Sequence, residues 1–176
     1  MPITRKTTTA KHSSGAAKAG PKDAVQLLTA DHKEVKGLFT RYQKLVDDEA
    51  GAEERQTLAE QICEMLTVHA TIEEEIFYPA ARAALEDQDM LDEAEVEHAS
   101  AKDLIAQIEG MSPDDDLYDA KVTVLGEYID HHVKEEEGEM FPKCRKADMD
   151  LSALGEELEA RKTELTEEVQ GELAAH

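Results

Sequence analysis

Large aromatic side chains are nearly missing from this chain. Phe, Trp and Tyr together make up 4% of its 176 residues, and tryptophan is absent. A buried core must therefore be built from Leu, Ile, Val, Ala and Met, in a composition rich in Ala, Glu, Lys and Leu. Such a composition favours long helices over sheets, and the length suits one core of ordinary size. The sequence therefore favours an all-α protein.

Positive charge is scarce as well: 19 Lys and Arg residues stand against 41 Asp and Glu residues, for a formal net charge of −22. A protein that binds the phosphate backbone of nucleic acid, or an anionic lipid surface, needs a basic face. The chain also lacks an apolar run of about 18 residues, the length that spans a membrane. We therefore expect no nucleic-acid partner and no membrane contact.

Cysteine is rare too. Cys63 and Cys144 lie far apart in the sequence and form no CxxC pair. Reduced thiols in a cytosol are a simpler interpretation than a disulfide, so we expect a cytoplasmic protein in which neither thiol is a metal ligand.

The first residues contain basic side chains and no acid, among Thr, Ser and Ala. They contain no apolar segment of the kind that a secretory signal needs. The composition is compatible with a transit peptide, but we interpret residues 1–21 as a flexible basic tail.

Apolar residues recur at steps of three and four along most of the remaining chain, which is the period of amphipathic helices. The expected helices span about residues 22–48, 53–86, 90–109 and 112–146, with a fifth from about residue 150 onward. Ser112-Pro113 is the expected start of the fourth helix, and Pro79 is expected to kink or end the second. Short connections favour an up-down-up-down four-helix bundle over residues 22–146, followed by an amphipathic helix over residues 147–176.

A histidine interrupts the apolar stripe of each of the first four helices. These histidines are His32, His69, His98 and His132. A single histidine on a core face is usually a structural residue with satisfied hydrogen bonds. One on each of four helices instead indicates a shared site.

Two carboxylates join these histidines. Glu73 follows His69 by four residues, and Glu136 follows His132 by four, so each pair lies on one helical face. A buried, unpaired carboxylate costs several kcal/mol, and a divalent cation offsets that cost. Imidazole with carboxylate suits iron, manganese or zinc. The alternative is that both acids belong to solvated acidic runs, as we expect of their neighbours Glu74 and Glu137.

The sequence repeats itself around these residues. Residues 31–39 match 97–105, and residues 69–79 match 132–142, with a proline ten positions after the histidine in both copies. This distance selects His132 over the adjacent His131. Two helical hairpins related by an approximate two-fold axis would place three ligands each around a common centre.

These motifs resemble the bacterial hemerythrin-like proteins that carry the His-His-Glu (HHE) cation-binding domain. The resemblance covers roughly residues 23–145 and rests on HxxxEE followed by an aromatic-Pro pair, twice, each preceded by an acid-His pair. It implies an up-down-up-down bundle with two non-haem iron ions bridged by Glu73 and Glu136. The ligands it implies are His32, His69, Glu73, His98, His132 and Glu136.

One departure concerns Lys102. Oxygen-carrying hemerythrins have a further histidine at this position, four residues after His98, and a protonated lysine is no ligand. A more open, carboxylate-rich site weighs against reversible oxygen carriage. We therefore expect a diiron protein that meets oxygen, peroxide or nitric oxide as sensor, scavenger or store.

Two alternatives remain from the sequence. The first is a diiron redox enzyme that consumes peroxide or oxidises ferrous iron, and the second is a metal-free helical interaction module. A ferritin-like enzyme would need the ExxH motif twice, whereas only Glu95-x-x-His98 occurs. The sequence leaves enzymatic turnover and the oligomeric state open.

Overall fold

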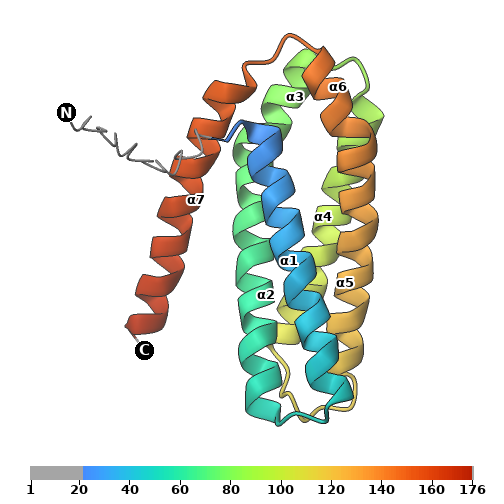
Figure 1. Cartoon of the computed structure of the whole chain (residues 1–176), viewed down its shortest axis with the longest axis vertical. Helices are drawn as coiled ribbons and strands as arrows, with labels where there is room; N and C mark the ends of the chain where they lie inside the picture. The colour runs from blue at the N-terminus through green and yellow to red at the C-terminus, as the bar shows by residue number, and fades with distance from the viewer. Residues whose placement is uncertain (1–21, 176) are drawn as a thin grey trace, which may run out of the picture.

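The computed structural model describes residues 22–175, which form helices and no strand. Four long helical rods run up-down-up-down, and a fifth helix lies beside them (Figure 1). The predicted all-α bundle is confirmed. No helix in the described part of the chain is long and apolar enough to cross a membrane. The predicted basic tail, residues 1–21, lies outside the described residues.

The second and fourth rods are each made of three consecutive segments, an α-helix, a wide π-helical turn (η) and a short α-helix. The elements are α1 (Ala24–Asp47), α2 (Ala52–Ile72), η1 (Glu73–Phe77), α3 (Tyr78–Ala84), α4 (Gln88–Glu109), α5 (Tyr118–Glu135), η2 (Glu136–Met140), α6 (Phe141–Lys146) and α7 (Leu151–Ala174).

The wide turns begin at Glu73 and Glu136, the two acids that the sequence predicts in the core. Single π-helical turns inside α-helices frequently mark functional sites. Pro79 does not end the second rod, because it lies at the start of α3, where a missing N–H costs little. The rod continues to Ala84, and the fourth rod passes Pro142 in the same way.

The fourth rod begins later than predicted, at Tyr118 rather than near Ser112. Residues 112–117 form turns, because the Asp115 side chain accepts a hydrogen bond from the Ser112 N–H at 2.9 Å and the Tyr118 N–H reaches the Asp115 carbonyl at 3.0 Å. Local side-chain bonds of this kind compete with helix formation. The helix starts where the buried ring of Tyr118 enters the core.

The core is divided into two apolar clusters along the bundle. One lies where α7 and the short helices α3 and α6 meet the start of α1, and the other fills the half that includes Tyr42, Ile62 and Leu125. Cys63 and Cys144 are buried in different clusters and form no disulfide. Along the helices, the predicted polar residues lie between the residues of these two clusters.

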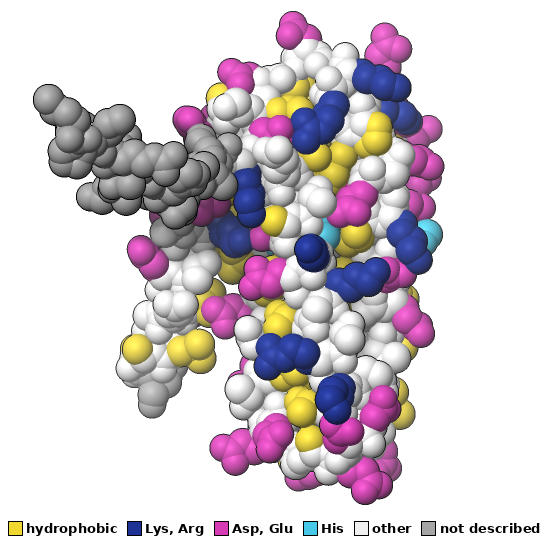
Figure 2. Space-filling model, viewed as in Figure 1, with side chains coloured by type: hydrophobic (Ala, Val, Ile, Leu, Met, Phe, Trp, Pro, Cys, Tyr) yellow, Lys and Arg dark blue, Asp and Glu magenta, His cyan; other side chains and the backbone are white. Residues whose placement is uncertain are grey.

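The fifth helix, α7, packs against α1 and α2 and diverges from them toward its C-terminus (Figure 1). Leu158 is fully buried in this contact. Gly155 permits the close approach, because a Cβ there would lie 2.4 Å from the Lys22 carbonyl oxygen. On the face shown in Figure 2, Asp and Glu side chains gather at both ends of the bundle, and Lys and Arg side chains lie between them.

Candidate metal centre

All six side chains predicted from the sequence meet in the middle of the bundle, each 7% exposed or less. One histidine comes from each of α1, α2, α4 and α5, and each glutamate is the first residue of a wide turn. The residues brought together are His32, His69, Glu73, His98, His132 and Glu136.

These side chains form two groups of four that share both glutamates. His32 and His69 face Glu73 and Glu136 on one side, and His98 and His132 face the same glutamates on the other, with ligand atoms within 4.8 Å of one another in each group. The Nε2 atoms lie 3.2 Å apart in the first histidine pair and 3.1 Å apart in the second. The arrangement offers two adjacent groups of donors that share both carboxylates, each of a kind that could hold a metal ion.

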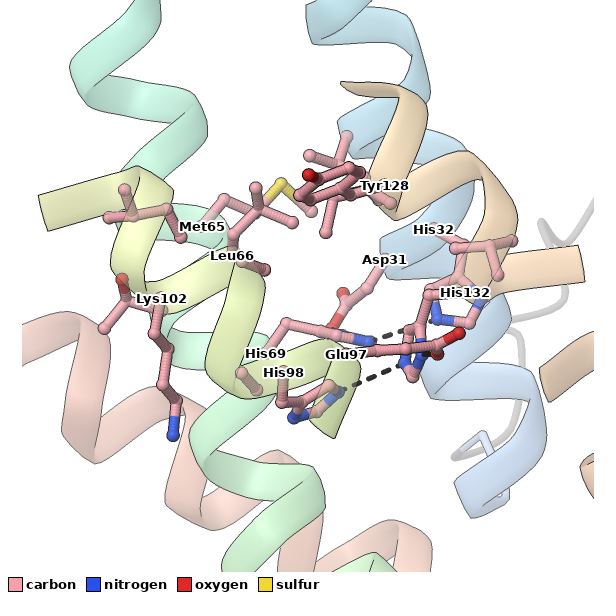
Figure 3. Close-up of a pocket in the computed structure, with 17 residues that line it drawn as sticks. Asp31, His32, Met65, Leu66, His69, Glu97, His98, Lys102, Tyr128 and His132 are labelled. Atoms are coloured by element: carbon pink, nitrogen blue, oxygen red, sulfur yellow. Dashed lines mark hydrogen bonds and ion pairs between the residues drawn. The ribbon is translucent and has the colours of Figure 1, made fainter. Parts of the chain in front are cut away.

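An outer carboxylate holds the Nδ1 atom of every one of these imidazoles. The four pairs are His69–Asp31 at 3.0 Å, His32–Glu137 at 3.0 Å, His98–Glu74 at 3.1 Å and His132–Glu97 at 2.5 Å. An ionised carboxylate only accepts, so each neutral ring carries its proton on Nδ1 and turns the Nε2 lone pair inward. Figure 3 shows Asp31 and Glu97 beside the histidines that they orient.

The role of Glu74 and Glu137 corrects an expectation. Their side chains are 31% and 39% exposed, but both bind a core histidine rather than only solvent. Asp31 and Glu97 were recognised only as part of the motif, not as hydrogen-bond partners. The signal for all four was the repeat itself. It places an acid directly before His32 and His98, and a second acid directly after each core glutamate.

The four carboxylate oxygens of Glu73 and Glu136 are buried and have the imidazoles of the centre as their polar neighbours. The nearest groups are imidazole nitrogens: His69 Nε2 lies against Glu73, and His132 Nε2 lies 2.5 Å from Glu136. With no cation or protonated imidazole beside them, such buried carboxylates would cost several kcal/mol each. Two cations placed among carboxylate oxygens and imidazole lone pairs would offset that cost, so the donor set fits a metal centre.

The pKa values of the buried histidines and of Glu136 also indicate a site that attracts positive charge. Burial opposes protonation of His69 and His132, but Glu73 and Asp31 raise the pKa of His69 to about 10, and Glu136 and Glu97 raise that of His132 to about 11. Burial and the neighbouring Glu73 charge raise the pKa of Glu136 to about 7. The metal-free centre thus retains protons where cations would otherwise balance the negative charge.

The family model of the hemerythrin HHE cation-binding domain matches residues 23–144. The chain belongs to this family. The family predicted from the motifs is confirmed, and so is the fold: a crystal structure of an HHE domain-containing protein from Mycobacterium kansasii has a TM-score of 0.72 and 25% identity. That likeness covers 87% of this chain and 93% of the other.

A relative described as a DNA nickase, from a Nostoc strain, is 32% identical over 119 residues. The match covers 68% of this HHE chain but only 32% of the relative, so the chain spans about a third of that protein's length. The nicking activity is a property of the longer protein.

Two lysines complete the surroundings of the HHE centre. Lys102 Nζ binds the Glu74 carboxylate at 2.7 Å and 2.5 Å, and its side chain is half-exposed. It therefore supports the acid that orients His98 instead of replacing a ligand. Lys162 of α7 binds Asp31 Oδ1 at 2.5 Å and so supports the acid that orients His69.

Tyr78 is a residue that the sequence reasoning did not assign to the centre. Its buried hydroxyl lies 3.1 Å from His98 Nε2 and 3.3 Å from His132 Nε2. Burial and the Glu73 charge raise the pKa of this phenol well above its usual range, so it stays neutral. Phe141 is the repeat-related residue and stacks on His32, so the two halves of the centre differ here.

A cavity of about 40 Å³ adjoins the centre on the side of Leu66, Ile105 and Ile129. Its wall is formed largely by aliphatic side chains together with the four histidines. The volume is enough for one or two molecules of the size of water. The cavity therefore has room for a small molecule beside the imidazoles (Figure 3).

Proposed function

We propose that this HHE protein binds two non-haem iron ions and reacts with a small oxygen or nitrogen species: oxygen, peroxide or nitric oxide. His32 and His69 would hold one ion, His98 and His132 the other, and the carboxylates of Glu73 and Glu136 would bridge both. The observation that carries the proposal is the pair of four-donor groups sharing two buried carboxylates whose polar neighbours are imidazole nitrogens. Manganese and zinc suit the same donors and are the alternative metals.

Bound iron would supply redox and Lewis-acid chemistry. The protein's own residues supply the rest. The outer carboxylates fix the ring orientations, and the aliphatic wall of the cavity limits access by water and by large or charged molecules. The net charge of −22 supports a small neutral ligand and no nucleic-acid partner.

The position of Lys102 supports reaction over reversible oxygen carriage. Its ammonium binds Glu74 on the outer side of His98, so each half of the centre has two imidazoles and no further one from residues 22–175. We propose that such a centre reacts irreversibly with oxygen instead of releasing it.

The test is anaerobic reconstitution with ferrous iron followed by gel filtration, metal analysis and exposure to oxygen. We expect about two iron ions per chain, because the structure offers two donor groups. We also expect oxygen uptake that is not recovered when the sample is evacuated. A chain that retains no iron contradicts the metal assignment, and oxygen recovered under vacuum restores the carrier function.

A second function, peroxide consumption by a diiron enzyme, is favoured by Tyr78. Its neutral hydroxyl can donate a hydrogen bond to an oxygen species in the half of the centre that contains His98. Tyr78→Phe should lower turnover of peroxide by roughly ten-fold or more if this donor acts in the reaction. The iron content should stay at two, since Phe141 occupies the related position. Unchanged turnover would leave Tyr78 a packing residue, and peroxide that is not consumed by the parent protein removes the enzyme alternative.

A further inference from the structure

A second group of metal-ligating side chains lies on the surface between α4 and α5. His131 Nε2 lies 3.4 Å from Glu97 Oε1 and 3.2 Å from Glu135 Oε1. One ligand atom from each of these three residues lies within 4.8 Å of the others. The imidazole is exposed, and Asp92 and Glu93 line the same shallow depression.

A four-residue spacing on each of the two helices brings these side chains onto a common face. His131 and Glu135 are four residues apart on α5 and face the same side of the helix, and Glu93 and Glu97 repeat that spacing on α4. An imidazole and carboxylates presented by two packed helices form a donor set for a divalent cation such as ferrous iron, manganese or zinc.

Glu97 connects this surface cluster with the buried centre. Its Oε1 atom faces His131, whereas its Oε2 atom accepts a hydrogen bond from His132 Nδ1 at 2.5 Å. A cation held by Glu97 would therefore lie one carboxylate away from a ligand of the centre.

The internal repeat shows what such a carboxylate does in the other half of the molecule. Asp31 is the counterpart of Glu97: it accepts from His69 with one oxygen and binds the Lys162 ammonium with the other, at 2.5 Å. In that half, the ammonium of Lys162 from α7 is the cation beside the outer carboxylate of Asp31. Within residues 22–175, Glu97 has histidine partners and no Lys or Arg partner.

The other members of the cluster take the place of buried apolar residues. By the repeat, His131 corresponds to Val68 and Glu135 to Ile72, which are buried on the α2 side of the bundle. Glu93 corresponds to Leu27, which packs in the same apolar cluster as Leu158 of α7. The face of α1 and α2 thus carries apolar residues and a lysine supplied by α7, whereas the face of α4 and α5 carries metal-ligating side chains.

We propose that Glu97, His131 and Glu135 bind a divalent cation at the surface, with Glu93 at the rim, and that ions enter the buried centre from this site through Glu97. The surface cation takes the place that the Lys162 ammonium takes beside Asp31. The entry role rests on the proposed metal centre, whereas surface binding itself does not.

Surface binding is tested on iron-loaded protein titrated with Mn²⁺, with free Mn²⁺ measured by electron paramagnetic resonance. The parent protein should bind one further ion, and H131A/E135Q should weaken this binding by roughly ten-fold or more while keeping its iron. Glu139→Gln is the control, since it removes the same charge from an exposed position of the same rod. Equal Mn²⁺ binding by parent and double variant overturns the site.

The entry role is tested by the rate at which metal-free protein takes up ferrous iron. H131A/E135Q should fill several-fold more slowly than the parent and the Glu139→Gln control, and all should reach the same final iron content. Equal filling rates overturn the entry role. A parent protein that retains no iron contradicts the buried centre instead, while the Mn²⁺ difference between parent and double variant still decides the surface site.

Discussion

Glu73→Gln should abolish the binding of both metal ions, whereas His32→Ala should abolish the binding of one. Glu73 belongs to both four-donor groups, while His32 belongs to one. Glutamine keeps the shape of the side chain but brings no negative charge, so it cannot bridge two cations as a carboxylate does. The measurement is iron per chain after anaerobic reconstitution and gel filtration, with circular dichroism to show that each variant remains helical.

Two further variants make this comparison sharper. Glu139→Gln, on the same wide turn as Glu136 but exposed, should keep both ions. Glu74→Gln should also keep both at saturation but with affinity lowered by roughly 10- to 100-fold, because a neutral amide replaces the charged acceptor that orients His98. Two ions retained by Glu73→Gln, or none by His32→Ala, would contradict the shared-carboxylate arrangement.

The six residues of the centre were predictable because helical geometry is strict. A histidine and a glutamate four residues apart must share a face, and an apolar stripe shows which face is buried. The repeat added the choice of His132, which is buried, over His131, which is exposed. Periodicity therefore predicted which residues face inward and that the helices form a bundle.

The same reasoning was incomplete for Glu74 and Glu137, since it applied the α-helical rotation of about 100° per residue. Wide turns begin at Glu73 and Glu136, so the residues that follow are not spaced as in an α-helix. A long glutamate side chain also reaches across to the neighbouring rod. The pattern of apolar residues in the sequence reveals neither the wide turn nor the reach of the glutamate side chain.

The position of α7 was not predictable from its own sequence, because an apolar stripe shows which face is buried but not its partner. The information lay in the repeat. Val68 and Ile72 are apolar where His131 and Glu135 are polar, which marks the outer face of α2 as covered. The Lys162–Asp31 bond depends on that packing and could not be foreseen from spacing.

The pH dependence of stability should differ between the metal-free and metal-loaded protein. Between pH 7 and 8 the metal-free protein should become less stable as the pH rises, while the metal-loaded protein should change little. The folded metal-free centre holds protons on His69 and His132, whose pKa values are about 10 and 11, but an unfolded histidine titrates near its ordinary value of 6.5. The folded state therefore binds more protons than the unfolded state, and stability is lost as the pH rises.

The size of the effect follows from the number of protons. Two such groups lower the free energy of unfolding by up to about 2.7 kcal/mol per pH unit, which corresponds to roughly 5–10 °C in melting temperature. Glu136, with a pKa of about 7, adds to the loss at the start of this range. Burial lowers the pKa of His32 and His98, so their contribution to the pH dependence lies below 6.5. Cys63 and Cys144 contribute only nearer the ordinary thiol value of 9.0.

Thermal unfolding in chelator and in iron-loaded samples, at pH 7.0, 7.5 and 8.0, measures the two slopes. Bound cations exclude the protons from His69 and His132. The metal-loaded protein therefore loses no proton-dependent stability between pH 7 and 8. Metal-free Glu73→Gln should show a shallower slope, because the Glu73 charge is the largest influence that raises the pKa of His69. Equal slopes with and without metal would mean that protons and cations do not compete for the same imidazoles.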